Sequence, residues 1–174
     1  MNARTIRRPR TGWRGYGRWL TALAVGLAAL QFIAAGPVSG APGDVTEYPL
    51  PNSRLPDRIA AGPDGSLWFT EYSGNGGTIV PEGIGRITPD GAINEFSTGI
   101  THGSGPVGIT AGADGNLWFT ENSADRIGRI TPEGVVTEFS TGITHNSDPF
   151  DITPGPDGNL WFSEPSSNRI GRIT

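Results

Sequence analysis

Short segments rich in apolar, β-branched and aromatic residues recur along the chain from about residue 44 onward. In one stretch they read VGIT, NLWFTE, RIGRIT and VVTEFS, and none is long enough for a helix of ordinary length. Turn sequences such as GADG, GPDG and TPDG separate them. The pattern therefore predicts groups of four antiparallel strands joined by short turns.

The segments belong to a repeat that occurs three times. Trp118 and Trp161 are 43 residues apart, and Trp68 lies 50 residues before Trp118 because a Gly-rich insertion at 73–83 adds seven residues. A period in the low forties is typical of β-propellers and solenoids. The Leu-Trp-Phe segments are apolar on both faces, which favours central strands covered on both sides by stacked sheets. We expect an all-β fold, a partial β-propeller of three four-stranded blades over 41–174, with repeats at about 44–91, 92–134 and 135–174.

The turn lengths predict the register of the central hairpins. If residues 122–125 form a hairpin loop, three cross-strand pairs follow in the second repeat, and the third repeat gives the same set. These pairs are Glu121–Arg126, Phe119–Gly128 and Trp118–Arg129, then Glu164–Arg169, Phe162–Gly171 and Trp161–Arg172. Opposite charges pair, the glycine leaves room for the Phe ring, and the arginine lies on the indole. In the first repeat Gly83 replaces the loop-end arginine, so we interpret Glu–Arg as a dispensable rim pair and Trp–Arg, which includes Trp68–Arg86, as scaffold.

The two ends of the repeat region are complementary. Residues 44–51 (DVTEYPLP) match the fourth strand of a repeat (VVTEFSTG), and the sequence stops after a third strand, RIGRIT. Residues 44–51 could therefore supply the fourth strand that the last blade lacks. A closed propeller needs roughly four to eight blades. The pattern favours the front part of a longer chain, and a three-blade unit that closes by assembling with copies of itself remains open. Open blade edges also predict self-association.

The first forty residues differ from the rest in charge and hydropathy. Six arginines lie within the first eighteen positions, and an apolar stretch of signal-peptide length follows at 20–41. We predict that 1–40 is an export signal, cut before Ala41, with an uncleaved membrane anchor as the alternative. Either way the repeats are expected to be secreted or extracytoplasmic.

The repeat region itself is acidic. After the leader, seven arginines and no lysine stand against seventeen acidic residues, a net charge of −10. Phosphate contacts need clustered Lys and Arg, so nucleic acid is a poor candidate partner. The chain has no cysteine, which excludes disulfides and thiolate metal sites.

The stretch ITAGADGNLWFTENSADRIGRITPEGVVTEF, residues 109–139, resembles the repeat of the virginiamycin B lyase (streptogramin lyase) family. The resemblance covers all three repeats, 44–174. It implies a seven-bladed propeller and a Mg²⁺-dependent carbon–oxygen lyase that confers antibiotic resistance. Such a lyase linearises streptogramin B, a small cyclic depsipeptide, by eliminative opening of its ester with a histidine base.

Carried over to this sequence, the resemblance leaves the catalytic residues unassigned. In the family the histidine stands in Pro-His-small-Ile, at the start of the first strand of the last blades. Asp57, Val107 and Phe150 hold that position here. The resemblance thus implies that the catalytic blades are absent from this chain and that the chain alone is inactive.

One Mg²⁺-binding glutamate of the family follows Trp-Phe in its final blade. Glu71, Glu121 and Glu164 match that position. Because every repeat has one, we interpret them as rim acids at strand ends, and no metal ligand is assigned.

Two histidines, His102 and His145, recur in TGITH at the same 43-residue spacing. We interpret them as repeated loop residues, because no close acidic pair accompanies them as in a metal site. Two interpretations of the insertion remain open, a loop that shapes a pocket and a tolerated surface excursion.

Two classes of function remain. The first is a lyase whose chemistry is supplied by blades that this chain does not contain. The second is a non-catalytic exported propeller that binds a ligand or partner, which the absent histidine and the leader favour.

Overall fold

The computed structural model describes residues 41–51, 54–73 and 82–174. The expected leader at 1–40 and most of the Gly-rich insertion, 74–81, lie outside the described residues. The chain divides into two units, 1–44 and 45–174, and all of the strands belong to the second. Within residues 41–51, 54–73 and 82–174, no helix has the length and the apolar character needed to cross a membrane.

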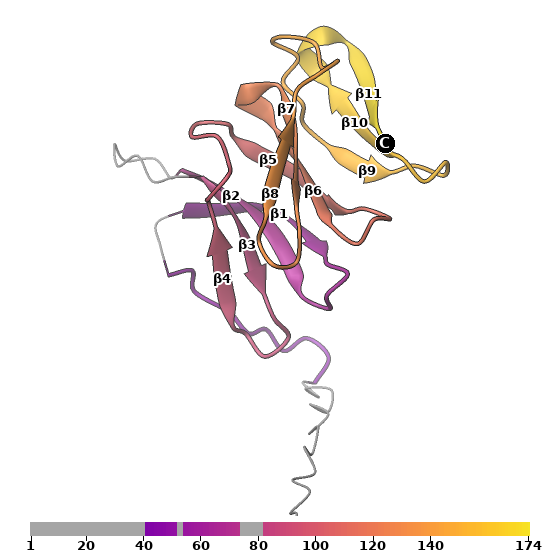
Figure 1. Cartoon of the computed structure of the whole chain (residues 1–174). Coiled ribbons are helices and arrows are strands. Elements are labelled where there is room, and N and C mark those ends of the chain that lie inside the picture. Colours follow the sequence, from indigo (N-terminus) through magenta and orange to yellow (C-terminus); the bar gives the residue numbers. More distant parts are fainter. Residues whose placement is uncertain (1–40, 52–53, 74–81) are drawn as a thin grey trace, which may run out of the picture. The chain divides into compact units, whose positions relative to one another are not determined.

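Eleven described strands form three antiparallel sheets that follow one another in chain order (Figure 1). Sheet 1 contains β1 (Arg54–Ala61), β2 (Leu67–Ser73), β3 (Gly83–Ile87) and β4 (Ile93–Phe96). Sheet 2 contains β5 (Pro106–Ala111), β6 (Leu117–Glu121), β7 (Arg126–Ile130) and β8 (Val136–Phe139). Sheet 3 contains β9 (Ile152–Pro154), β10 (Leu160–Glu164) and β11 (Arg169–Ile173). The all-β architecture expected from the repeat is confirmed.

The predicted hairpin register is confirmed in every sheet. Trp118 pairs with Arg129, Phe119 with Gly128 and Glu121 with Arg126. The corresponding pairs occur between β10 and β11, and Trp68 pairs with Arg86. A Cβ atom at Gly128 would lie 2.1 Å from the Phe119 ring, so only glycine leaves room for that ring.

Each Leu-Trp-Phe tryptophan is held from several sides. The Trp118 Nε1–H donates to Asp114 Oδ1 at 3.1 Å, and the Arg129 guanidinium carbon lies 5.6 Å from the indole centroid. The Phe139 ring of β8 stacks on the indole with a centroid distance of 5.4 Å. Sheet 1 repeats this arrangement at Trp68, which confirms that tryptophan and arginine are part of the scaffold.

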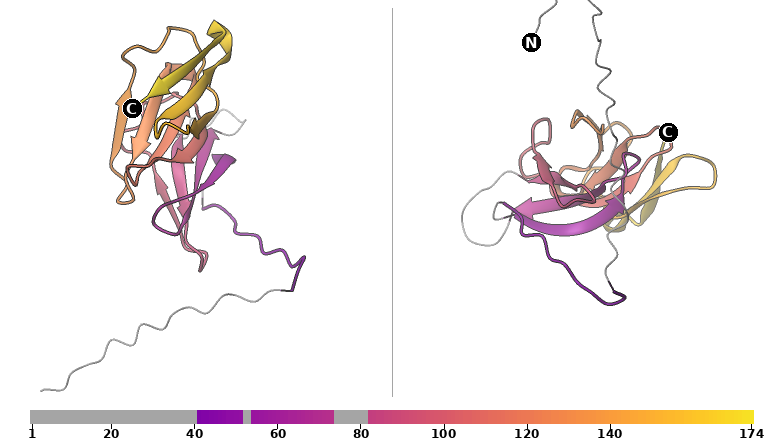
Figure 2. Two further views of the ribbon diagram at one scale, coloured as in Figure 1. Left: turned by 90° about the vertical axis from the view of Figure 1, so that its right-hand side faces the viewer. Right: turned by 90° about the horizontal axis from the view of Figure 1, so that it is seen from below.

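Two apolar clusters form the core, and each joins neighbouring sheets. The first brings Trp68 and Ile84 of sheet 1 against Leu117 and Phe119 of sheet 2. The second brings Trp118 and Ile127 of sheet 2 against residues of sheet 3. The views in Figure 2 agree with this order, with sheet 3 at the far end from sheet 1. The Leu-Trp-Phe strand of sheet 2, β6, is therefore buried along its whole length because a neighbouring sheet covers each of its faces, as in a propeller.

Sheet 3 differs from the expectation of four strands per blade. It has three, and residues 44–51, the segment expected to supply the fourth, form no strand. Instead Tyr48 and Leu50 lie along an apolar groove on sheet 1. Residues 44–51 therefore do not pair with sheet 3 in this structure, in which sheet 2 lies between sheet 1 and sheet 3.

Candidate functional site

The first strands of the three sheets, β1, β5 and β9, are neighbours, and a relay of buried hydroxyl groups ties their N-terminal ends together. Thr70 Oγ1 accepts a hydrogen bond from the Arg58 N–H at 3.1 Å and donates to the Val107 carbonyl of the next sheet at 2.8 Å. Thr120 Oγ1 links the Gly108 N–H, at 2.8 Å, and the Phe150 carbonyl, at 2.9 Å, in the same way. The relay brings together the three positions at which the family motif carries histidine.

The relay was not predicted from the sequence. Its only signal is that Thr70, Thr120 and Ser163 occupy equivalent positions directly before the buried glutamates. Ser163 Oγ accepts from the Asp151 N–H at 3.1 Å, which continues the series into sheet 3. A small hydroxyl side chain suits this position because it can accept a hydrogen bond from a backbone N–H of its own sheet and donate one to a backbone carbonyl of the next sheet.

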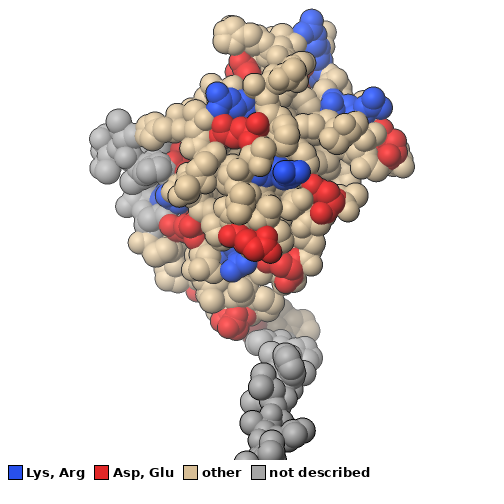
Figure 3. Space-filling model, viewed as in Figure 1, with Lys and Arg blue, Asp and Glu red and all other residues tan. Residues whose placement is uncertain are grey.

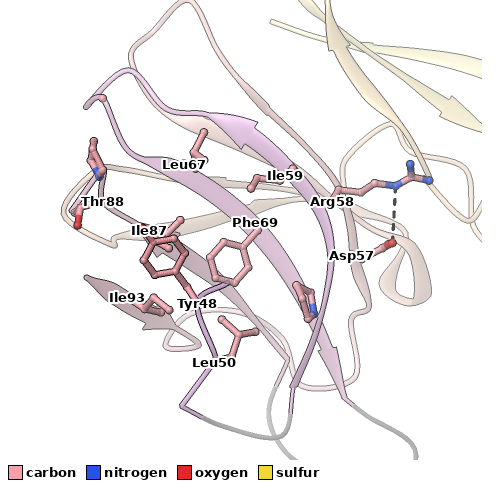
Figure 4. A pocket seen from close by; sticks show the side chains of 13 residues that line it. Tyr48, Leu50, Asp57, Arg58, Ile59, Leu67, Phe69, Ile87, Thr88 and Ile93 are labelled. Carbon is pink, nitrogen blue, oxygen red and sulfur yellow. Dashed lines mark ion pairs between the residues drawn. The ribbon is translucent and has the colours of Figure 1, made fainter. Parts of the chain in front are cut away.

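The side chains at these strand ends are exposed and chemically distinct. The Arg58 guanidinium carbon lies 5.6 Å from the centroid of the Phe150 ring, and Arg58 Nε lies 4.0 Å from Asp57 Oδ1. A register shift between Pro56 and Ile59 turns this part of β1 away from regular pairing. Figure 4 shows Asp57 and Arg58 to one side of the apolar residues of sheet 1. The pair presents guanidinium donors beside an aromatic face, which suits a ligand that carries both carbonyl oxygens and aromatic rings.

The glutamates after Trp-Phe are not rim acids, which corrects the expectation from the sequence. Glu71 and Glu121 are fully buried, and Glu164 is nearly so. Burial raises the pKa of Glu71, and Arg54, whose Nη1 lies 3.0 Å from Glu71 Oε2, only partly offsets this effect. The sequence pattern placed these acids at strand ends, but the neighbouring sheet and the loop before each first strand cover them.

Glu121 shows the strongest effect of burial. Burial raises its pKa to about 8, and the charge of Glu138 adds to the rise. Among the described residues neither carboxylate oxygen has a partner in hydrogen-bonding geometry, although Ser104 lies beside it. The Arg126 guanidinium, which is opposite Glu121 in the register, pairs with Glu138 instead, with Nη1 2.5 Å from Oε2. Burial therefore favours the protonated form of Glu121.

These glutamates do not fit a magnesium site. Mg²⁺ takes six oxygen ligands and keeps several waters. Glu71 is paired with Arg54, and the burial of Glu121 favours its neutral form. The described residues contain no cluster of three or more His, Asp or Glu side chains that could hold a metal ion.

The arginine that lies near the buried glutamate comes from a different strand in sheet 1 than in sheet 2. This difference was not predicted from the sequence. Gly83 stands where sheet 2 has Arg126, and Arg54 stands where sheet 2 has Ser104. Arg54 reaches both Glu71 and Glu95, the counterparts of Glu121 and Glu138. The Glu–Arg pair is therefore not dispensable in sheet 1, because a different strand supplies its cation. On the face drawn in Figure 3, arginine and acidic side chains likewise lie next to one another.

Both histidines lie in loops between sheets, as expected. His145 is exposed, and its Nδ1 lies 3.1 Å from Asp125 Oδ2. Burial opposes ionisation of Asp125, but hydrogen bonds from three backbone N–H groups at 146–148 and from His145 outweigh it and lower its pKa. Asp125 thus fastens the loop to sheet 2, and His145 is one of its partners. His102 is exposed in the equivalent loop.

Three tandem antiparallel sheets, packed face to face with their first strands adjacent, define a segment of a β-propeller. The sequence model of the virginiamycin B lyase family matches residues 35–174, and the chain belongs to this family.

Individual relatives support the same family. A virginiamycin B lyase from Bordetella parapertussis is 44% identical over 62 residues, which cover 34% of this chain and 18% of the relative. The crystal structure of a virginiamycin B lyase from Staphylococcus aureus is 46% identical with a TM-score of 0.66, and the match covers 76% of this chain and 42% of that one. A catalytically inactive form of that lyase, solved with quinupristin, is 45% identical with a TM-score of 0.67 and covers 78% and 43%. This chain thus spans about two fifths of the solved lyases.

Proposed function

We propose that this chain supplies three blades of a streptogramin B lyase-type propeller and that the ends of β1, β5 and β9 form part of its ligand-binding face. The observation that carries the proposal is the Arg58–Phe150 pair. It joins β1 of sheet 1 to the loop before β9 of sheet 3, where Phe150 stands at a position that matches the histidine of the family motif and Arg58 directly follows another such position, Asp57. Family membership supports the class of activity, and the quinupristin complex of the S. aureus lyase supports a cyclic depsipeptide as ligand.

In this proposal the described residues bind and orient the ligand. Arg58 donates to carbonyl oxygens of the depsipeptide, and Phe150 packs on an aromatic side chain. Asp57, Val107 and Phe150 stand where the family motif has histidine, so these three blades supply no histidine at that position, and the buried glutamates do not fit Mg²⁺. The proposal assigns the histidine base and the Mg²⁺ ligands of the family to blades other than these three. The metal would stabilise negative charge on the ligand during ester opening.

Binding and turnover test the proposal separately. In calorimetry with quinupristin, the 174-residue chain is expected to bind saturably. Arg58→Ala or Phe150→Ala should weaken binding by about tenfold, or ~1.4 kcal/mol, as expected for a desolvated cation–aromatic contact. Val135→Ala, a change on the exposed β7–β8 turn, is the matched control and should bind normally. Mass spectrometry with Mg²⁺ should show no ring-opened product from this chain.

Two results would contradict the proposal. Ring opening that disappears on substitution of His102 or His145 would place a base among these blades. Failure to bind quinupristin would favour the second function, a non-catalytic exported binding propeller. The absence of a histidine at 57, 107 and 150 is the specific observation behind that second function.

We also propose export of the repeat region, on the strength of the basic and apolar leader at 1–40. Protein purified from the extracytoplasmic fraction should begin near Ala41 by N-terminal sequencing. Uncleaved protein found only in the cytoplasm would contradict this part of the proposal.

A further inference from the structure

The loop before β9 is held by a carboxylate of sheet 2. Asp125 ends the short 3₁₀ turn Asn122–Ala124 between β6 and β7, and its backbone lies in the left-handed region with a φ of 53°. The N–H of Asn146 donates to Asp125 Oδ2 at 2.7 Å. The N–H groups of Ser147 and Asp148 donate to Oδ1 at 2.9 and 3.2 Å. One side chain of sheet 2 therefore fixes three consecutive residues that lead into sheet 3.

This contact needs a carboxylate because both oxygens of Asp125 act as acceptors. Nδ1 of His145 also lies 3.1 Å from Oδ2. An asparagine would keep one carbonyl oxygen and would direct an NH₂ group, which cannot accept, at backbone N–H donors. Asparagine nevertheless fits the turn, since Asn168 has the equivalent position in sheet 3 with a φ of 54°. Asp125→Asn therefore removes acceptors and keeps the turn.

Two further side chains of sheet 2 extend the attachment to Phe150. Asn122 Nδ2 donates to the Pro149 carbonyl at 3.4 Å, and Thr120 Oγ1 donates to the Phe150 carbonyl at 2.9 Å. The Phe150 N–H donates to the Ser163 carbonyl of sheet 3 at 3.0 Å. The backbone is thus held on both sides of this residue, whereas its side chain is 42% exposed. The aromatic ring is the part of the residue that these contacts leave available to a ligand.

The loop before β5 offers a comparison within the same chain. Glu82 directly precedes β3, as Asp125 directly precedes β7, so the two acids are counterparts. Within the described residues, the Glu82 carboxylate accepts a single hydrogen bond, from the Gly105 N–H at 2.7 Å. That loop leads to Val107, which has no aromatic ring to place. The more extensive attachment therefore occurs in the loop that carries Phe150.

We propose that Asp125 is a positioning residue of the ligand-binding face, whose carboxylate holds the loop so that the Phe150 ring stays beside the Arg58 guanidinium. The guanidinium carbon lies 5.6 Å from the ring centroid. Asp125 acts through Phe150 and does not itself contact the ligand. Without the carboxylate, three N–H groups lose their shared acceptor, and a ligand must order the loop as it binds, which weakens binding. The inference rests on the proposed function, because that function makes Phe150 a ligand contact.

A measurement without ligand tests the positioning. In the 174-residue chain with 4-fluorophenylalanine at position 150, the ring fluorine is expected to give one NMR resonance. Arg58→Ala should shift this resonance, because the guanidinium lies on the ring. In Asp125→Asn the resonance should move toward its position in the urea-unfolded chain and should respond much less to Arg58→Ala. An Asp125→Asn resonance that coincides with that of the parent, and still responds fully to Arg58→Ala, would overturn the proposal.

Calorimetry with quinupristin tests the consequence for binding. Asp125→Asn should raise Kd about three- to tenfold, the scale of the cost of ordering one side chain on binding. In a Phe150→Ala background the same substitution should have no further effect, because Asp125 acts through that ring. An equal loss in both backgrounds would show a general structural effect and would contradict the positioning role. If the parent chain does not bind quinupristin, the proposed function fails, and the fluorine spectra still decide whether Asp125 positions Phe150.

Two control variants isolate the contact between the carboxylate and the backbone. His145→Ala removes an exposed partner of Asp125 and keeps the three backbone hydrogen bonds, so its spectrum and affinity should match those of the parent. Asp90→Asn makes the same substitution in the exposed turn between β3 and β4, at the opposite end of sheet 1, and should also match the parent. An effect of either control as large as that of Asp125→Asn would count against the proposal.

A milder variant keeps the proposal testable if Asp125→Asn does not fold, which far-UV circular dichroism would reveal. Asn122→Ala removes only the hydrogen bond to the Pro149 carbonyl. It should move the fluorine resonance in the same direction as Asp125→Asn, by a smaller amount. With Asp125→Asn unfolded, an unshifted resonance in Asn122→Ala would overturn the proposal.

Discussion

At the scale of single residues, the repeated tryptophan joins the parts of each sheet. Trp118 contacts an aspartate from the preceding turn, an arginine from the next strand and a phenylalanine from the fourth strand. It also belongs to the cluster that joins sheet 2 to sheet 3. One side chain therefore couples the pairing within a sheet to the packing between sheets.

Trp118→Ala is expected to lower the free energy of unfolding by about 3–5 kcal/mol, because it removes a large buried aromatic side chain. Denaturant unfolding monitored by far-UV circular dichroism measures the change. Trp161→Ala is the matched comparison, and it should cost clearly less because Trp161 is only partly buried and no ring stacks on it among the described residues. A loss below about 1 kcal/mol at Trp118 would contradict its place in the core.

Glu121 is expected to make stability depend on pH. Its pKa in the folded protein, about 8, lies above the value of 4.5 for an exposed glutamate, so the folded state binds the extra proton. The contribution to stability is thus fully present below about pH 4.5 and is lost as the pH rises through about 8. Glu121→Gln keeps the neutral form at all pH values, so its stability relative to the parent should increase from pH 5 to pH 9 in urea unfolding.

Glu138→Gln is the control with the opposite sign. Burial opposes ionisation of Glu138, but hydrogen bonds from Thr101 and Arg126 outweigh it and lower its pKa. The stability from Glu138 is therefore present at neutral pH and is lost as the pH falls through its folded pKa. The same pH slope in both variants would contradict the assignment of the proton to Glu121.

At the scale of strands and sheets, the spacing of the sequence predicted the pairing of strands that are adjacent in the chain. A four-residue hairpin loop fixes which residues face one another, so the Trp–Arg and Phe–Gly pairs followed directly. The hydroxyl relay and the burial of the glutamates depend on the backbone of the neighbouring sheet, which no local pattern encodes. Arg54 was missed for a related reason, because it reaches Glu71 from a different strand than Arg126 does in sheet 2.

Thr120→Val is expected to destabilise the contact between sheets 2 and 3 by about 0.5–1.5 kcal/mol, because the Phe150 carbonyl loses the Thr120 hydroxyl and keeps only the Gly108 N–H as a hydrogen-bond donor. Thr120→Ser keeps the hydroxyl and should lose less. Thr137→Val, on an exposed position of β8, should be nearly neutral. Chemical denaturation of the three variants measures these differences, and equal stability of Thr120→Val and the parent would contradict the relay.

At the scale of the whole molecule, the repeat predicted three blades and the family, and the structure defines how they meet. Each sheet covers the Leu-Trp-Phe strand of its neighbour, so sheet 2 is covered on both faces. The sequence also marked residues 44–51 as a fourth strand, but it could not show where that strand pairs, because pairing depends on which sheet edge lies within reach. The ends of β1, β5 and β9 form a shared surface only because the sheets stack in order.

Hydrogen–deuterium exchange with mass spectrometry tests this central claim, that the Leu-Trp-Phe strands are interior, most directly. Amides of β6 (Leu117–Glu121) and β7 (Arg126–Ile130) should exchange most slowly, because they lie in the middle of the sheet that is covered on both faces. Residues 41–51, which form no strand, should exchange fastest among the described segments. Exchange in β6 as fast as in residues 41–51 would contradict the account.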